Sequence, residues 1–204
     1  MKDFATLFTA LDQTNSTLKK VEALAQYFNK SEDQDKLWTI AILSHRRPKR
    51  TVKTTLLREW AAQESEIPLW LFEEAYHTVG DLAEAIALVV PESKKSQDHS
   101  LSYWIDQIIS LGKEEEETKR KAIVSAWLLM DTAERFVFNK LITGGFRMGV
   151  SQKLMTRALS KHTEIDEGEL AHRLMGDWSP QKTTFKELIL TKDEKADLSK
   201  PYPF

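Results

Sequence analysis

The sequence predicts an all-α protein of about a dozen helices in two related halves. Hydrophobic residues recur at helical spacing along the whole chain, beginning with Phe4, Leu7, Phe8 and Leu11. The seven glycines and six prolines lie near the joints expected between helices. Two segments of the first half also match segments of the second half in the same order and at nearly the same offset. This last observation favours an internal duplication over coincidence.

The first half, about residues 1–91, contains helices whose starts carry capping residues. Gly80 and Pro91 end two of them, because glycine suits the end of a helix and proline cannot continue one. The expected helices follow Asp3, Ser16, Ser31, the basic turn at 44–53, Pro68 and Asp81. Ser31 and Gln34 could form a capping box, and Thr51 or Thr54 could cap the helix after the basic turn. Pro68 suits a first helical position.

A polar stretch at 92–100 leads into the second half, about residues 100–198. Its first helix carries Leu101 and Trp104, and a later one begins with the acidic run 114–117, which suits the positive end of a helix dipole. Another helix ends at Leu141, and the remaining helices follow Ser151, Asp166 and Pro180. Residues 199–204 contain two prolines and are expected to begin a linker.

Composition restricts the possible functions. A chain of 204 residues with 41% hydrophobic residues can bury a sizeable core. The formal net charge of −2 argues against coating nucleic acid by bulk positive charge, so any such binding must come from local patches. There are no cysteines, no N-terminal signal region and no apolar run of membrane length, which favours a cytoplasmic protein.

No catalytic or metal site is expected. Gly144 and Gly149 have the spacing of a phosphate-binding P-loop, but Val150 stands where that motif needs lysine. The five histidines show no metal-ligand spacing, and no isolated carboxylate pair or Gly-x-Ser-x-Gly elbow is present. The aromatic residues Trp38, Trp60, Phe136 and Phe138 fall on apolar helix faces and are expected in the core.

Two turns at corresponding places of the repeat are the strongest candidates for function. A shift of 98 positions places Lys49 on Arg147, and a shift of 96 places residues 75–82 on 171–178. The first turn crowds five positive charges around Pro48, whereas the second is rich in glycine and precedes a helix that Ser151 could cap. Glycines allow backbone N–H groups to approach a ligand closely, and the start of a helix attracts anions. A phosphate is therefore the expected ligand.

Two such turns on one surface could hold the two backbones that flank one groove of duplex DNA. Contacts of this kind fix the register of a protein on DNA without reading its sequence. The candidate DNA-binding residues are Ser44, His45, Arg46, Arg47, Lys49, Arg50, Thr51, Lys53 and Thr54 in the first turn, and Thr143, Gly144, Gly145, Arg147, Gly149, Ser151 and Lys153 in the second.

Several segments also carry a family resemblance. They are LSHRRPKR at 43–50, WLFEE at 70–74 with VGDL at 79–82, FNKLITGGFRMGV at 138–150, HRLMGDW at 172–178 and KPYPF at 200–204. With these segments, which span essentially the whole chain, the sequence resembles the N-terminal DNA-binding domain of ATP-dependent DNA ligases, most closely the bacterial type.

The resemblance implies a helical domain, residues 1–198, whose halves are related by a pseudo-two-fold axis and lie across the minor groove of nicked duplex DNA. Its partners would be the ligase's own adenylation and OB-fold domains, which seal nicks in replication, repair or recombination with ATP and magnesium. That chemistry needs a Lys-x-Asp-Gly motif, and this chain contains no Asp-Gly. The chain alone is therefore expected to be inactive, to hold no cofactor and to be a monomer.

Two hypotheses remain open from the sequence. The first is the nick-binding domain just described, and the second is an α-helical adaptor that binds another protein and has no affinity for DNA. Asp81 and Asp177 carry alternatives of their own, because each could cap a helix or lie near DNA.

Overall fold

The computed structural model describes residues 1–92, 97–146 and 148–191. Every regular element in these ranges is helical, which confirms the predicted all-α class. None of the described helices is long and apolar enough to span a membrane. Residues 199–204, the expected start of a linker, lie outside the described residues.

The helices repeat along the chain at a nearly constant interval. Each of the first five α-helices begins 98 or 99 residues before its counterpart among the last five, which supports the duplication seen in the sequence. The first six are α1 (Lys2–Asp12), α2 (Thr17–Lys30), α3 (Asp33–Leu43), α4 (Thr54–Glu64), α5 (Leu69–Val79) and α6 (Leu82–Val89). The others are α7 (Leu101–Ser110), the 3₁₀ turn η1 (Leu111–Lys113), α8 (Glu116–Leu129), α9 (Thr132–Thr143), α10 (Gln152–Thr163), α11 (Glu167–Met175) and the π-helical η2 (Lys186–Leu190).

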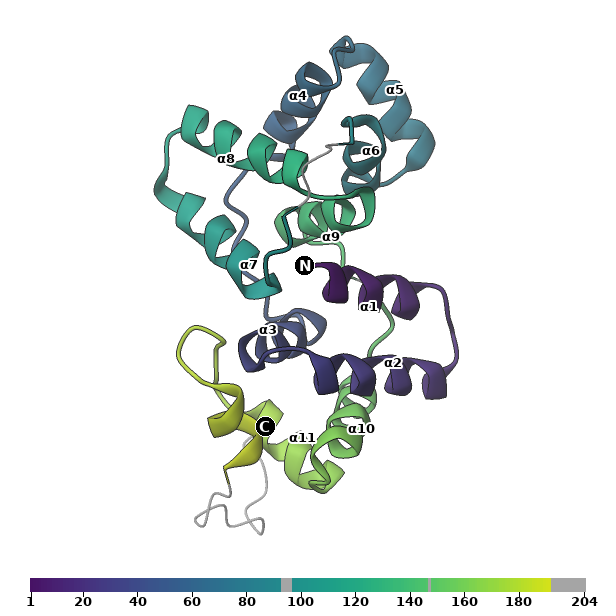
Figure 1. The fold of residues 1–204 in the computed structure, drawn as a ribbon, viewed down its shortest axis with the longest axis vertical. Helices are drawn as coiled ribbons and strands as arrows, with labels where there is room; N and C mark the ends of the chain where they lie inside the picture. The colour runs from purple at the N-terminus through teal and green to yellow at the C-terminus, as the bar shows by residue number, and fades with distance from the viewer. Residues whose placement is uncertain (93–96, 147, 192–204) are drawn as a thin grey trace.

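The molecule has two lobes, and each contains helices from both parts of the repeat. Figure 1 shows α1, α2, α3, α10 and α11 in the lower lobe and α4 to α9 in the upper lobe. The contacts follow the repeat, because α1 packs on α9 as its counterpart α7 packs on α3. Likewise, α2 packs on α10 and α8 packs on α4. Among the helices that the structure describes, the chain therefore passes from one lobe to the other between α3 and α4, over residues 44–53, and between α9 and α10, over residues 144–151.

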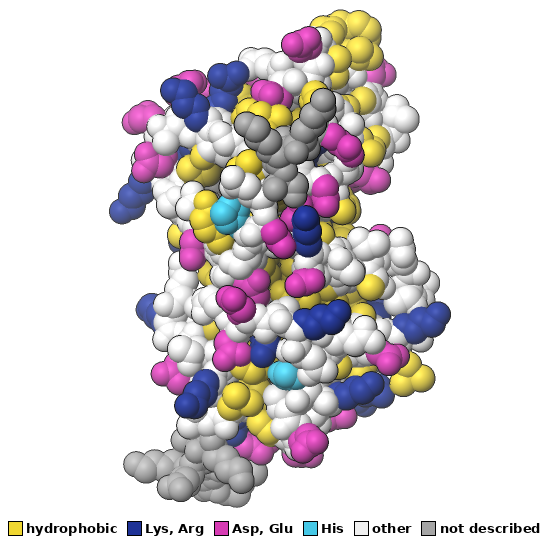
Figure 2. All heavy atoms as spheres, in the orientation of Figure 1, with side chains coloured by type: hydrophobic (Ala, Val, Ile, Leu, Met, Phe, Trp, Pro, Cys, Tyr) yellow, Lys and Arg dark blue, Asp and Glu magenta, His cyan; other side chains and the backbone are white. Residues whose placement is uncertain are grey.

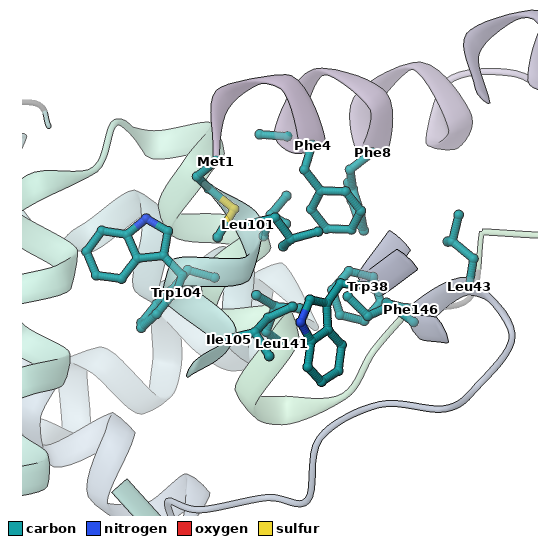
Figure 3. Packing of buried hydrophobic residues seen from close by; sticks show 14 of the residues in the cluster. Met1, Phe4, Phe8, Trp38, Leu43, Leu101, Trp104, Ile105, Leu141 and Phe146 are labelled. Carbon is teal, nitrogen blue, oxygen red and sulfur yellow. The ribbon is translucent and has the colours of Figure 1, made fainter. Parts of the chain in front are cut away.

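A hydrophobic core lies where the two lobes meet. Figure 3 shows Phe4 of α1, Trp38 of α3, Leu101 of α7 and Leu141 of α9 packed together with Phe146, which follows α9. All five side chains are buried. The lobes are thus joined by shared apolar packing, and the segment after α9 is anchored in it through Phe146.

Several helix ends form as the sequence predicts. The side chains of Ser16, Asp81, Ser151 and Asp166 each accept a hydrogen bond from the backbone of the first turn of their helix. Gly80 ends α5 in the left-handed conformation, with φ of 78°. The proposed core residues Trp38, Trp60 and Phe138 are buried, and the half-buried Phe136 packs edge-on against Phe8.

Several predicted helix boundaries are wrong. α1 begins before Asp3, Pro68 stands one residue before the first helical position of α5, and α9 continues past Leu141 to Thr143. Ser31 ends α2 and forms no capping box, because α3 begins at Asp33 with Glu32 at its N-cap position. The Gln34 amide nitrogen donates a hydrogen bond to the carbonyl of Pro180, 3.0 Å away. Neither Thr51 nor Thr54 caps α4, which begins directly after Lys53. No helix begins at Pro180; a turn follows it, and η2 starts only at Lys186.

A buried arginine joins two helix ends in the upper lobe. Arg135 of α9 is fully buried, and all five of its N–H groups can be satisfied by backbone carbonyls. The accepting carbonyls belong to Ala87, Val90 and Pro91 at the end of α6, and to Trp127 and Met130 at the end of α8. The last carbonyls of a helix lack partners within the helix, so Arg135 stabilises both ends at once.

Candidate nucleic-acid interface

The two predicted turns meet in the structure. We call residues 44–53, between α3 and α4, the first connection and residues 144–151, between α9 and α10, the second connection. The guanidinium of Arg50 donates a hydrogen bond of 2.9 Å to the carbonyl of Thr143. The Arg47 guanidinium lies against Gly144, where a Cβ atom would stand 1.1 Å from its Nη1. Segments 98 residues apart in the repeat therefore form one surface.

Most of the cations in the first connection face solvent. Arg47, Lys49, Arg50 and Lys53 are exposed, as is His45, which has a positive φ of 63°. Ser44, Thr51 and Thr54 are half-buried. Val52 is buried and anchors the segment, so the charged side chains around it are held on a fixed stretch of backbone.

Arg46 has partners within the protein. Its Nη1 donates to the carbonyl of Trp178 at 2.9 Å, and its Nη2 donates to the carbonyls of Leu174 and Gly176 at 3.3 and 3.0 Å. The guanidinium carbon also lies 4.7 Å from the centre of the Trp178 ring. Arg46 thus ties the first connection to the end of α11.

The second connection alternates between the core and the surface. Phe146 and Met148 are buried, whereas Gly145, Gly149 and Ser151 are exposed, as is Lys153 in the first turn of α10. Thr143 and Gly144 are half-buried, and Arg147 lies outside the described residues. Gly144 and Gly149 have φ angles of 89° and 59°, a region that glycine enters without strain.

Two buried lysines support the second connection from below. Lys20 of α2 donates a hydrogen bond of 2.5 Å to the carbonyl of Met148, and Lys140 of α9 pairs with Asp81. Asp81 therefore has two tasks, because it also caps α6. Sequence reasoning missed both lysines. For Lys20 the sequence does hold a signal, because it lies four residues before Leu24 and hence on the apolar face of α2.

The two helices that leave the connections start differently. Ser151 caps α10 through the N–H of Leu154, at 3.2 Å, whereas no side chain caps the exposed start of α4. An open groove of about 360 Å³ borders that start and is lined by residues 50–55. A second groove of about 380 Å³ is lined by Thr54 at the start of α4, by Lys140 of α9, and by Gly144 and Gly145 of the second connection. Because Thr54 lines both, the grooves adjoin.

The chemistry of this surface suits an anion. It combines exposed guanidinium and ammonium groups with the N–H groups at the start of α4. The space beside Gly144, Gly145 and Gly149 is taken by the side chains of Arg47, Lys140 and Lys20, so the close approach that these glycines permit is used by the protein itself. In the ranges described by the structure, no three His, Asp or Glu side chains are grouped so that they could hold a metal ion.

Comparison with known proteins agrees with the resemblance seen in the sequence. The family model described as the DNA ligase N terminus matches residues 1–160, which include both connections. A comparison with curated proteins found no match. The family match covers more than half of the chain, and the all-helical architecture fits it. The chain belongs to the family of N-terminal domains of ATP-dependent DNA ligases.

Proposed function

We propose that this chain binds nicked duplex DNA for an ATP-dependent ligase, with the two connections contacting phosphates on either side of one minor groove. The proposal rests on the contact between the two repeats. The Arg47 guanidinium lies against Gly144 and Arg50 donates to the carbonyl of Thr143, while Lys49 and Lys53 of the first connection are exposed. The family match supports a DNA ligase as the setting.

The net charge of the chain favours DNA binding through a local group of cations. With a net charge of −2, attraction by the whole molecule contributes little, so Arg47, Lys49, Lys53 and Lys153 must supply the phosphate contacts. Such contacts position DNA without reading its sequence. Arg46 supports the surface from inside, because its guanidinium is engaged by backbone carbonyls.

Sealing would need the ligase's adenylation and OB-fold domains, which would supply ATP and magnesium chemistry. This chain has no Asp-Gly, so no residue here fits the adenylated lysine, and we derive no step of sealing from it. Its own task would be to hold the nicked ends, as a cytoplasmic monomer, in replication, repair or recombination.

The test is fluorescence anisotropy of a labelled nicked duplex titrated with the 204-residue chain at several salt concentrations. We expect binding whose log K falls linearly with log salt, because released counterions set the slope. Lys121→Ala, which removes an exposed lysine on α8, is the control and should leave the slope unchanged. A folded chain with no affinity at low salt would instead favour the α-helical adaptor.

A further inference from the structure

The start of α5 exposes a group of large apolar side chains. Leu69, Trp70 and Leu71 are 43%, 67% and 41% exposed, and Phe72 is the helix's only fully buried residue. Figure 2 shows hydrophobic side chains gathered at the top of the molecule, where α5 begins in Figure 1. A tryptophan exposed beside two exposed leucines is unusual for a solvated surface and typical of a binding anchor.

The surroundings of this apolar group are acidic. From Glu59 to Glu92 the sequence has eight acidic residues and no lysine or arginine. Glu66 and Glu74 are exposed beside the apolar group, and Glu64 is half-buried. The neighbouring Arg58 is paired with Glu73 at 3.3 Å, so it does not offset these charges. We call residues 64–71 together with Glu74 the α5 tip.

The α5 tip lies away from the proposed DNA contacts. α4 runs from the first connection to the tip, and its eleven residues separate the two by about 16 Å. An acidic surface repels DNA phosphates, so the tip has no part in that contact. The domain thus places positive charge at one end of α4 and negative charge with apolar side chains at the other.

We propose that the α5 tip binds an amphipathic helical segment of another protein, with lysine or arginine beside an apolar face. Trp70 and its two leucines would contact the apolar face, and Glu64, Glu66 and Glu74 would attract the basic flank. Charge complementarity selects this partner over an acidic one. The proposal is independent of DNA binding, because it uses none of the residues of the two connections.

The probe is a short fluorescent peptide of leucine and lysine with amphipathic helical spacing, titrated into the 204-residue chain and followed by anisotropy. The same peptide with glutamate in place of lysine is the charge control. We expect the basic peptide alone to bind, and Trp70→Ala to weaken it by at least about tenfold, because central tryptophans dominate such interfaces. Glu66→Gln with Glu74→Gln should weaken it by about threefold and reduce its salt dependence.

Leu18→Ala is the matched control, since Leu18 is 71% exposed on α2 in the other lobe. It should leave peptide binding unchanged. Equal binding of both peptides, or affinity unchanged by Trp70→Ala, overturns the proposal. Sedimentation tests a different occupant: concentration-dependent dimers that Trp70→Ala abolishes would assign the tip to a second copy of this chain and also overturn it. Because Trp70 is exposed, the variant's unfolding midpoint should match that of the unaltered chain.

Discussion

The cations of the first connection have two kinds of task. Arg46 donates hydrogen bonds to three carbonyls near the end of α11, whereas Lys49 extends into solvent. The sequence identifies both as basic residues of one turn. It cannot separate them, because the partners of Arg46 lie about 130 residues further along the chain and only the fold brings them together.

This difference gives a paired prediction for Arg46→Ala and Lys49→Ala. Arg46→Ala should lower the free energy of unfolding by roughly 2 kcal/mol, since charged donors to three carbonyls are lost. Lys49→Ala should leave stability within about 0.5 kcal/mol and reduce the salt slope of DNA binding by about one. Urea unfolding and anisotropy titrations measure the two effects. The assignment fails if Arg46→Ala lowers the slope without lowering stability.

His162 should make stability depend on pH. Burial lowers the pKa of His162, and the positive charge of Lys36 lowers it further. The unfolded chain therefore takes up a proton near pH 6.5 that the folded chain resists, so stability is full above about pH 6.5 and falls as the pH drops below it. We expect His162→Gln to flatten this slope in urea midpoints measured across the range. His45→Gln, at an exposed position, is the control and should retain the slope.

At the scale of elements, glycines with positive φ end two helices in different surroundings. Gly144 ends α9 with the Arg47 guanidinium against it, while Gly80 ends α5 with nothing within 4 Å of an added Cβ. Gly80→Ala and Gly144→Ala should each cost about 1 kcal/mol of stability from backbone strain. Only Gly144→Ala should also weaken DNA binding, because Arg47 must move. Equal DNA affinity of both variants would contradict a role for the contact between Arg47 and Gly144.

The ends of α6 and α8 depend on one residue. Arg135→Met keeps much of the side-chain length but leaves five carbonyls without their donor. We expect a loss of at least about 3 kcal/mol in the free energy of unfolding. Lys121→Met, on the exposed face of α8, should change it by less than about 0.5 kcal/mol. A small loss for Arg135→Met, measured by urea unfolding, would show that water satisfies these carbonyls instead.

Local signals explain which elements could be predicted. Ser16, Asp81 and Ser151 cap helices because a short polar side chain reaches the backbone of its own first turn, whatever the rest of the fold. The capping box at Ser31 does not form, because α3 begins one residue later, with Glu32 at its N-cap position. The contact that Gln34 makes instead is long-range and could not be predicted. Gln34 meets the carbonyl of Pro180, which only the packing of η2 and its preceding turn brings near α3.

For the whole molecule, the sequence predicts the all-helical class and the duplication, but not how the repeats exchange helices between lobes. Helical periodicity reports which face of a helix is buried, and says nothing of the partner. The pairing of α1 with α9 and of α7 with α3 depends on the complete core. It also explains why turns 98 residues apart in the repeat lie together, with Arg50 bonded to Thr143.

The most direct test of this arrangement is hydroxyl-radical footprinting of a nicked duplex bound by the chain. Two connections on one surface should protect two short windows, one on each strand across the same minor groove. Lys49→Ala should weaken one window and Lys153→Ala the other, because Lys49 lies in the first connection and Lys153 lies in the first turn of α10, next to the second connection. If only one strand is protected, or if each variant loses both windows together, the two connections do not contact separate strands and the proposed arrangement is wrong.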